Sequence, residues 1–123
     1  MAAKVVDASV LGALLFGEPR AEEAFSLLKG CDLYAPPLLA YELTSIARKK
    51  ALKHPELLEK IRASLEVGLA LDIHWTEMDH LAVLKLALKE GLTTYDAAYL
   101  YLARTLKIPL VTFDEELQRV TSR

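Results

Sequence analysis

The chain has 123 residues, of which 53% are hydrophobic and 26% are charged, and its formal net charge is −2. This length suits one domain with a real hydrophobic core, so we treat residues 1–123 as a single domain. No apolar run reaches the ~18 residues of a membrane span, the first residues lack a secretory signal, and Cys31 stands alone, which excludes a disulfide framework and a cysteine-based zinc site. We therefore expect a cytoplasmic protein that does not contact membranes.

Short apolar runs alternate with helical patterns along the whole chain, and glycine or proline marks most boundaries. In chain order, the predicted elements are a strand over 4–7, helices over 10–16 and 18–29, a strand over 32–35, helices over 37–53 and 56–67, a strand over 71–75, helices ending at 89 and spanning 94–106, a strand over 109–113 and a helix over 115–120. Strands separated by helices predict an α/β fold, with a parallel sheet between two layers of helices.

The strand sequences also predict positions within the sheet. The runs Val5-Val6 and Leu110-Val111 are apolar without interruption, which suits interior strands. Residues 71–75 alternate between apolar and polar, which suits a half-exposed edge strand. If the strands over 4–7 and 109–113 are neighbours, the residues that follow them meet at the carboxyl edge of the sheet, where open α/β sheets bind ligands.

Two helix starts carry capping signals. Thr76 with Asp79 resembles a capping box for the helix that ends at residue 89. Thr93 or Thr94 is expected to cap the helix over 94–106.

Four acidic residues occupy unusual positions. Asp7 and Asp114 each close an apolar strand, Asp96 lies in the first turn of a helix, and Glu42 lies on the apolar stripe of another helix. Ionised carboxylates are costly to bury without partners, and a shared divalent cation is the most economical explanation for all four. Mg²⁺ and Mn²⁺ prefer such oxygen ligands and can activate water against a phosphodiester.

Each acid also has a simpler explanation when it is considered alone. Asp7 and Asp114 could cap the helices that follow them, and Asp96 could interact with the positive end of its helix dipole. Glu42 shares a helix face with aliphatic residues, so it either tilts into solvent or is buried with a partner. The shared-cation hypothesis is favoured because all four can converge.

Other residues complete the list of candidates. Hydroxyls at Ser9, Thr93, Thr94 and Thr112 lie beside three of the acids and could orient ligands or water, although capping explains Thr93 or Thr94 equally well. The sequence has no phosphate-binding glycine loop and no nucleophile elbow, and its histidines are dispersed. Tyrosines in the 94–106 helix could stack on bases, but packing is the favoured interpretation; they are Tyr95, Tyr99 and Tyr101.

Together these segments resemble the ordered motifs of the PIN domain, a family of small metal-dependent ribonucleases that includes the VapC-type toxins of toxin–antitoxin pairs. The motifs are Val5-Val6-Asp7-Ala8-Ser9, Tyr41-Glu42-Leu43, Thr94-Tyr95-Asp96-Ala97-Ala98-Tyr99 and Val111-Thr112-Phe113-Asp114. The resemblance implies an α/β/α sandwich with a parallel sheet of four strands, or of five if residues 120–122 supply one.

The resemblance also implies functional roles. Asp7, Glu42, Asp96 and Asp114 would be catalytic residues that bind Mg²⁺ or Mn²⁺, with Thr112 in support. The substrate would be RNA, and the basic residues near two of the acids would contact its phosphates; they are Arg48, Lys49 and Arg104. A small antitoxin partner and a homodimer or higher oligomer are also expected.

Two other classes of protein remain open. One is a catalytically idle PIN-like module that serves in binding or assembly. The other is a phosphatase-like or response-regulator-like domain, which would need a lysine after a late strand, whereas Lys107 precedes the last predicted strand.

Overall fold

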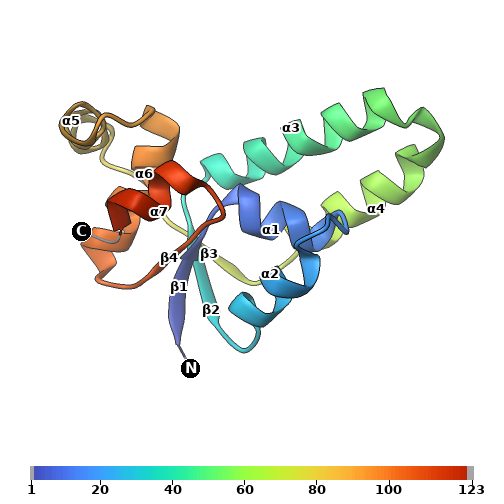
Figure 1. Ribbon diagram of the computed structural model, residues 1–123, viewed down its shortest axis with the longest axis horizontal. Helices are drawn as coiled ribbons and strands as arrows, with labels where there is room; N and C mark the ends of the chain where they lie inside the picture. The colour runs from blue at the N-terminus through green and yellow to red at the C-terminus, as the bar shows by residue number, and fades with distance from the viewer. Residues whose placement is uncertain (1, 122–123) are drawn as a thin grey trace.

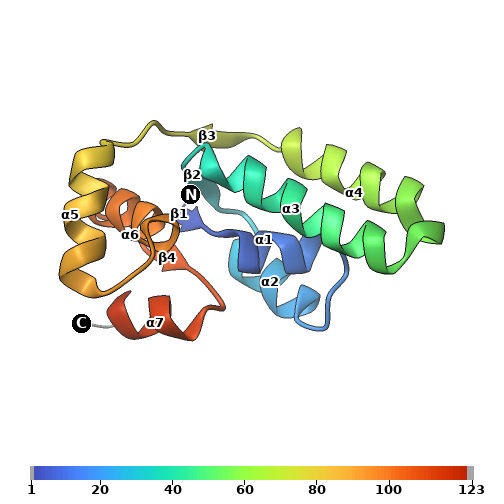
Figure 2. The same cartoon turned by 90° about the horizontal axis from the view of Figure 1, so that it is seen from above.

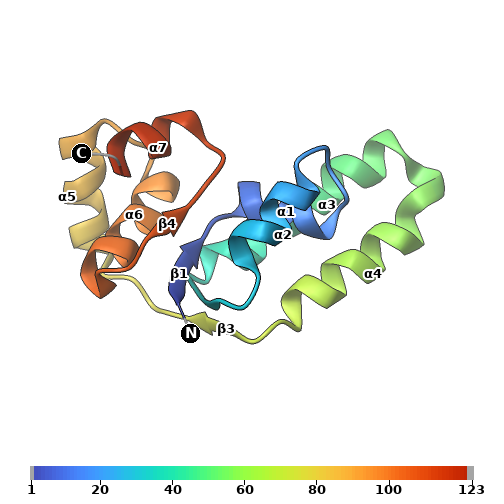
Figure 3. The same cartoon turned by 60° about the horizontal axis from the view of Figure 1, so that its bottom comes forward.

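In a computed structural model, which describes residues 2–121, four parallel strands form a single sheet in the order β3-β2-β1-β4 (Figure 1). The elements are β1 (Ala3–Val6), α1 (Ala8–Leu15), α2 (Ala21–Leu28), β2 (Asp32–Ala35), α3 (Leu38–Lys53), a 3₁₀ turn (Pro55–Leu57), α4 (Leu58–Leu69), β3 (Ile73–Trp75), α5 (His80–Glu90), α6 (Thr94–Leu106), β4 (Leu110–Val111) and α7 (Glu115–Thr121). Helices α1–α4 lie on one side of the sheet and α5–α7 on the other (Figures 2 and 3). The predicted α/β/α sandwich with a four-stranded parallel sheet is confirmed.

Strand β1 lies inside the sheet and organises the site. It pairs with β2 on one side and with β4 on the other, where Val5 is opposite Leu110 and Val6 is opposite Val111. The β-branched side chains of Val5 and Val6 are fully buried, as an interior strand requires. Because β1 and β4 are parallel and end in register, Asp7 emerges directly beside Thr112.

The predicted interior position of the last strand is wrong. Among residues 2–121, β4 pairs with β1 alone and forms an edge of the sheet. Helices α6 and α7 cover this edge strand, which explains its apolar sequence. Leu110 packs against the buried cluster of Leu100, Leu117 and Val120 from these helices. A fifth strand over residues 120–122 is also not formed, because Val120 and Thr121 belong to α7; Ser122 lies outside the described residues.

The predicted capping box before α5 is not formed, because Thr76 does not cap this helix and Asp79 does. The Thr76 hydroxyl donates to the carbonyl oxygen of His74 at 3.1 Å, which ties it to the end of β3. Asp79 is the N-cap and accepts from the backbone N–H of Ala82 at 3.1 Å. The prediction of a threonine cap for α6 is confirmed for Thr93, whose hydroxyl accepts from the N–H of Asp96 at 3.1 Å.

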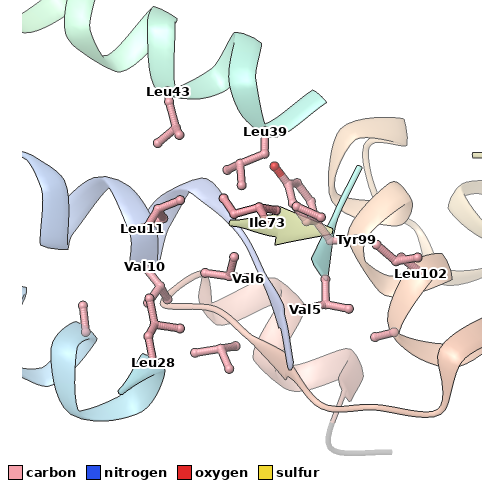
Figure 4. Packing of buried hydrophobic residues seen from close by; sticks show 14 of the residues in the cluster. Val5, Val6, Val10, Leu11, Leu28, Leu39, Leu43, Ile73, Tyr99 and Leu102 are labelled. Carbon is pink, nitrogen blue, oxygen red and sulfur yellow. The ribbon is translucent and has the colours of Figure 1, made fainter. Parts of the chain in front are cut away.

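The largest hydrophobic cluster lies between the sheet and the two helical layers (Figure 4). It joins β1 to α1 and α3 and reaches α6 through Tyr99 and Leu102. Strand β3 is an edge strand, as predicted, although it begins at Ile73 rather than at residue 71. Within the described chain, no helix combines the length and apolar character needed to cross a membrane.

Candidate active site

Asp7 is the most firmly held acid at the carboxyl edge of the sheet, and only 5% of its surface is exposed. Its Oδ1 atom accepts hydrogen bonds from the backbone N–H of Ser9 (3.1 Å), the Ser9 hydroxyl (2.6 Å) and the backbone N–H of Val10 (3.2 Å). Its Oδ2 atom accepts from the Thr112 hydroxyl at 2.5 Å. Burial raises the pKa of Asp7, and these hydrogen bonds oppose the shift. Asp7 is thus both the N-cap of α1 and a buried carboxylate.

Thr112 and Ser9 connect Asp7 to the segment that carries Asp114. The Thr112 hydroxyl oxygen accepts from the backbone N–H of Asp114 at 2.9 Å, and the Ser9 hydroxyl oxygen accepts from the backbone N–H of Phe113 at 2.9 Å. Asp114 itself is exposed, and its Oδ1 atom caps α7 by accepting from the N–H of Leu117 at 3.0 Å. The register of β1 and β4 therefore places Asp7 beside Thr112, whose hydroxyl also binds the backbone of Asp114.

Glu42 reaches the same edge from α3 and is half-buried. Its Oε1 atom accepts a hydrogen bond from the Tyr99 hydroxyl of α6 at 2.5 Å, so Glu42 is buried with a partner rather than tilted into solvent. The Tyr99 ring lies in the core with its hydroxyl directed toward α3 (Figure 4). Burial raises the pKa of Glu42, the Tyr99 hydrogen bond lowers it, and the charges of Asp7 and Asp96 raise it further.

Asp96 links the four acids electrostatically. Burial is the main cause of its raised pKa, and the charges of Asp114 and Asp7 add to the increase. Asp96 is therefore within electrostatic range of Asp7 and Asp114, and Glu42 is within range of Asp7 and Asp96. Among residues 2–121, however, no three His, Cys, Asp or Glu side chains are already arranged as a complete set of metal ligands.

The remaining predicted site residues are not all in this network. Thr94 is exposed at the start of α6 and lines a neighbouring cleft, whereas Thr93 makes the capping hydrogen bond. Arg48 and Lys49 are exposed in the second half of α3. Arg104 forms an ion pair with Glu90 of α5 at 3.3 Å, so this predicted RNA contact has a structural partner.

The sequence interpretation assigned Tyr99 to packing and missed its hydrogen bond to Glu42. Packing is confirmed, because the ring is buried, but the hydroxyl also holds a site residue. A signal was present: Tyr99 follows Asp96 by three residues and so lies on the same face of its helix. A tyrosine buried beside acids needs an acceptor for its hydroxyl.

We expect Tyr99→Phe to fold normally but to cleave RNA about 10-fold more slowly, if Glu42 acts as a ligand. The substitution keeps the buried ring and removes the hydrogen bond that stabilises the charged carboxylate, and the loss of such a supporting contact typically costs about 10- to 100-fold. Loss of this hydrogen bond raises the pKa of Glu42, so the rise of the cleavage rate with pH that reports deprotonation of Glu42 should move to higher pH. Cleavage rates measured across a pH series would show this shift. An unchanged pH profile would show that the hydroxyl serves packing alone.

Comparison with known proteins identifies the family of this chain. Residues 4–122 match the model of the PIN domain, so the chain belongs to the PIN-domain family. It is 36% identical over 122 residues to Ribonuclease VapC3 of Pyrobaculum aerophilum, an alignment that covers 92% of this chain and 90% of that protein. It is also similar to the crystal structure of PAE2754 from Pyrobaculum aerophilum, with a TM-score of 0.76 and 28% identity over 96% of this chain and 85% of the other.

Proposed function

We propose that this protein is an endoribonuclease that hydrolyses RNA phosphodiester bonds with a divalent cation bound by Asp7, Glu42, Asp96 and Asp114. The observation that carries the proposal is the geometry of the sheet edge, where β1 and β4 end in register, Ser9 and Thr112 hold the Asp7 carboxylate, and Tyr99 holds Glu42. Membership of the PIN-domain family and the similarity to a protein named a ribonuclease support it.

The donor set fits Mg²⁺ or Mn²⁺. All four side chains offer hard carboxylate oxygens. Burial, and after it the charges of neighbouring acids, raise the pKa values of Glu42 and Asp96, and a bound cation would offset both effects. When bound, such a cation polarises a phosphoryl oxygen and lowers the pKa of its bound water.

The residues of this chain have distinct tasks in that reaction. Ser9 and Thr112 fix the orientation of the Asp7 carboxylate from both sides, and Tyr99 fixes Glu42. Thr112 holds Asp114 at its backbone N–H, and the N–H of Leu117 donates to the Asp114 carboxylate, so both contacts keep this acid at the end of β4. A preorganised cluster of this kind avoids the cost of gathering carboxylates during the reaction.

Removal of the cation gives a direct test. A labelled single-stranded or loop-containing RNA should be cleaved with Mn²⁺ or Mg²⁺, left intact in EDTA, and cleaved again when excess Mn²⁺ is added. Glu59→Gln, which removes an exposed charge on α4, is the matched control and should cleave as the wild type does. Full cleavage in EDTA would contradict the proposed mechanism, and no cleavage with either metal would favour the idle-module alternative.

Partners and location follow as further parts of the proposal. We infer that the protein acts in the cytoplasm, is inhibited as a toxin by a small antitoxin, and forms a homodimer or higher oligomer. Exposed leucines on α5, including Leu81 and Leu88, support a protein–protein interface on this helix. The exposed Arg48 and Lys49 on α3 are available to RNA phosphates. Light scattering, and co-purification with the product of the neighbouring gene, would test these inferences.

A further inference from the structure

A mostly apolar cleft of about 490 Å³ lies between the starts of α3, α5 and α6. Its walls include Leu38, Tyr41, Met78, Val83, Tyr95 and Ala98. The volume is in the ~300–1,000 Å³ range of small-molecule sites, which are typically apolar with a few polar groups that set orientation. Here the polar groups are Glu77, His80 and Thr94.

Two tyrosines on this cleft are unusually exposed. The exposed fraction is 75% for Tyr41 and 62% for Tyr95, whereas Tyr99 on the next turn of α6 is buried. The function proposed above uses neither exposed ring, and packing, which explains Tyr99, does not explain them. Two aromatic rings left in solvent on one cleft indicate a surface that binds something flat and apolar.

The cleft adjoins the acid cluster through both helices. Tyr41 precedes Glu42 and Tyr95 precedes Asp96, so each tyrosine is one residue from a proposed metal ligand. Successive residues in an α-helix are about 100° apart around its axis. The same two helical turns therefore direct acids toward the sheet edge and tyrosines toward the cleft, and the Tyr99–Glu42 hydrogen bond joins these helices.

The chemistry of the cleft suits one part of an RNA chain. Phosphates would be repelled by the nearby acids and by Glu77, whereas a nucleobase is uncharged and stacks on aromatic side chains. The side chains of His80 and Thr94 could form hydrogen bonds with the edge of such a base. An unpaired base enters a cleft of this kind at the lowest cost, because no base pair has to be broken.

We propose that this cleft is a subsite for one unpaired nucleobase next to the cleaved phosphodiester, with Tyr41 and Tyr95 as its stacking residues. The proposal rests on the proposed ribonuclease function and adds to it a binding site for one base of the RNA substrate. The two tyrosines would set where along such an RNA the cut is made.

Alanine and phenylalanine variants provide the test. Tyr41→Ala and Tyr95→Ala should each raise KM for a short RNA at least about fivefold, as expected for the loss of one stacked base, while Tyr41→Phe and Tyr95→Phe should retain wild-type KM. Phe25→Ala on α2 is the control, because this ring is 53% exposed and lies outside the cleft. On an RNA with an abasic nucleotide at the subsite position, wild type and alanine variants should become equal.

Binding measured without cleavage separates this proposal from the ribonuclease proposal. In an Asp7→Asn background, the fluorescence anisotropy of a labelled RNA with Mn²⁺ should show the same loss for the alanine variants. If the wild type does not cleave RNA, the proposed function fails, and the anisotropy still tests the cleft. Unchanged KM and unchanged binding in both alanine variants would overturn the subsite. A dimer that dissociates in Tyr41→Ala without any loss of RNA binding would also overturn it and show a contact between copies.

Discussion

Asp96→Asn is expected to lower the rate of RNA cleavage at least about 100-fold, since even residues that only orient metal ligands typically contribute about 10- to 100-fold. The same substitution should raise the melting temperature in EDTA by roughly 2–5 °C. It removes one of four mutually repelling carboxylates, and burial and the charges of Asp114 and Asp7 already disfavour the charged form of Asp96. Activity and stability should therefore change in opposite directions.

The pH dependence of the metal-free wild type has the same origin. Asp7, Glu42 and Asp96 have folded pKa values above their ordinary values of 3.8 for Asp and 4.5 for Glu. A raised carboxyl pKa contributes stability that is fully present below the ordinary value and is lost as the pH rises through the folded value. In EDTA the wild type should therefore melt at a higher temperature near pH ~5 than near pH ~8. Mn²⁺ should restore stability at the higher pH, because it binds the native state.

Thermal melts of wild type and Asp96→Asn, in EDTA and in Mn²⁺, measure both effects, with Glu59→Gln as the charge-matched control on α4. If the mutant is less stable than the wild type in EDTA, Asp96 serves mainly to balance its helix dipole. If Mn²⁺ also leaves the melting temperature of the wild type unchanged, the hypothesis of a shared cation site is contradicted.

The second large effect is expected for Thr112→Val. Valine has nearly the same shape but removes the hydroxyl that donates to Asp7 and accepts from the backbone N–H of Asp114. Thr112 and Asp7 are both buried, so the lost hydrogen bonds should reduce the free energy of unfolding by about 2 kcal/mol. Cleavage should fall about 10- to 100-fold, because Asp7 and Asp114 lose their fixed relation.

Thr112→Ser is the matched control, since it retains the hydroxyl and loses only a methyl group. Urea unfolding and cleavage rates of the two variants give the comparison. Equal behaviour of the valine and serine variants would mean that the hydroxyl contributes neither to stability nor to the site.

The strand–helix pattern predicted the fold because local composition and burial agree for most elements. Val5-Val6 is apolar and its strand is interior, as predicted. The pairing of β1 with β4 was only a condition in the sequence analysis, because all strands of a parallel sheet end at the same edge, and the structure shows that these two strands pair. The position of Leu110-Val111 did not, because an edge strand covered by α6 and α7 has the same apolar composition as an interior strand.

For the site, residue type and position in the chain indicated the four acids, but their partners required the structure. Capping and a role in the site were treated as alternatives for Asp7; the structure shows that its carboxylate caps α1 with one oxygen and accepts from Thr112 with the other, so capping leaves the proposed role open. The spacing of Asp96 and Tyr99 indicated that the Tyr99 hydroxyl needs an acceptor near the site, but Glu42 lies 57 positions away, so the identity of the acceptor required the structure.

The hydrogen bond between Asp7 and Thr112 spans 105 positions of the chain and has a consequence for biosynthesis. Strand β1 emerges from the ribosome early, yet its neighbour β4 and the acid that follows it are among the last described segments to be made. A nascent chain that ends before residue 110 lacks both the partner of Asp7 and the fourth carboxylate. An enzyme that cuts RNA as proposed would thus remain inactive on the ribosome until residues 110–114 have been made and have paired with β1.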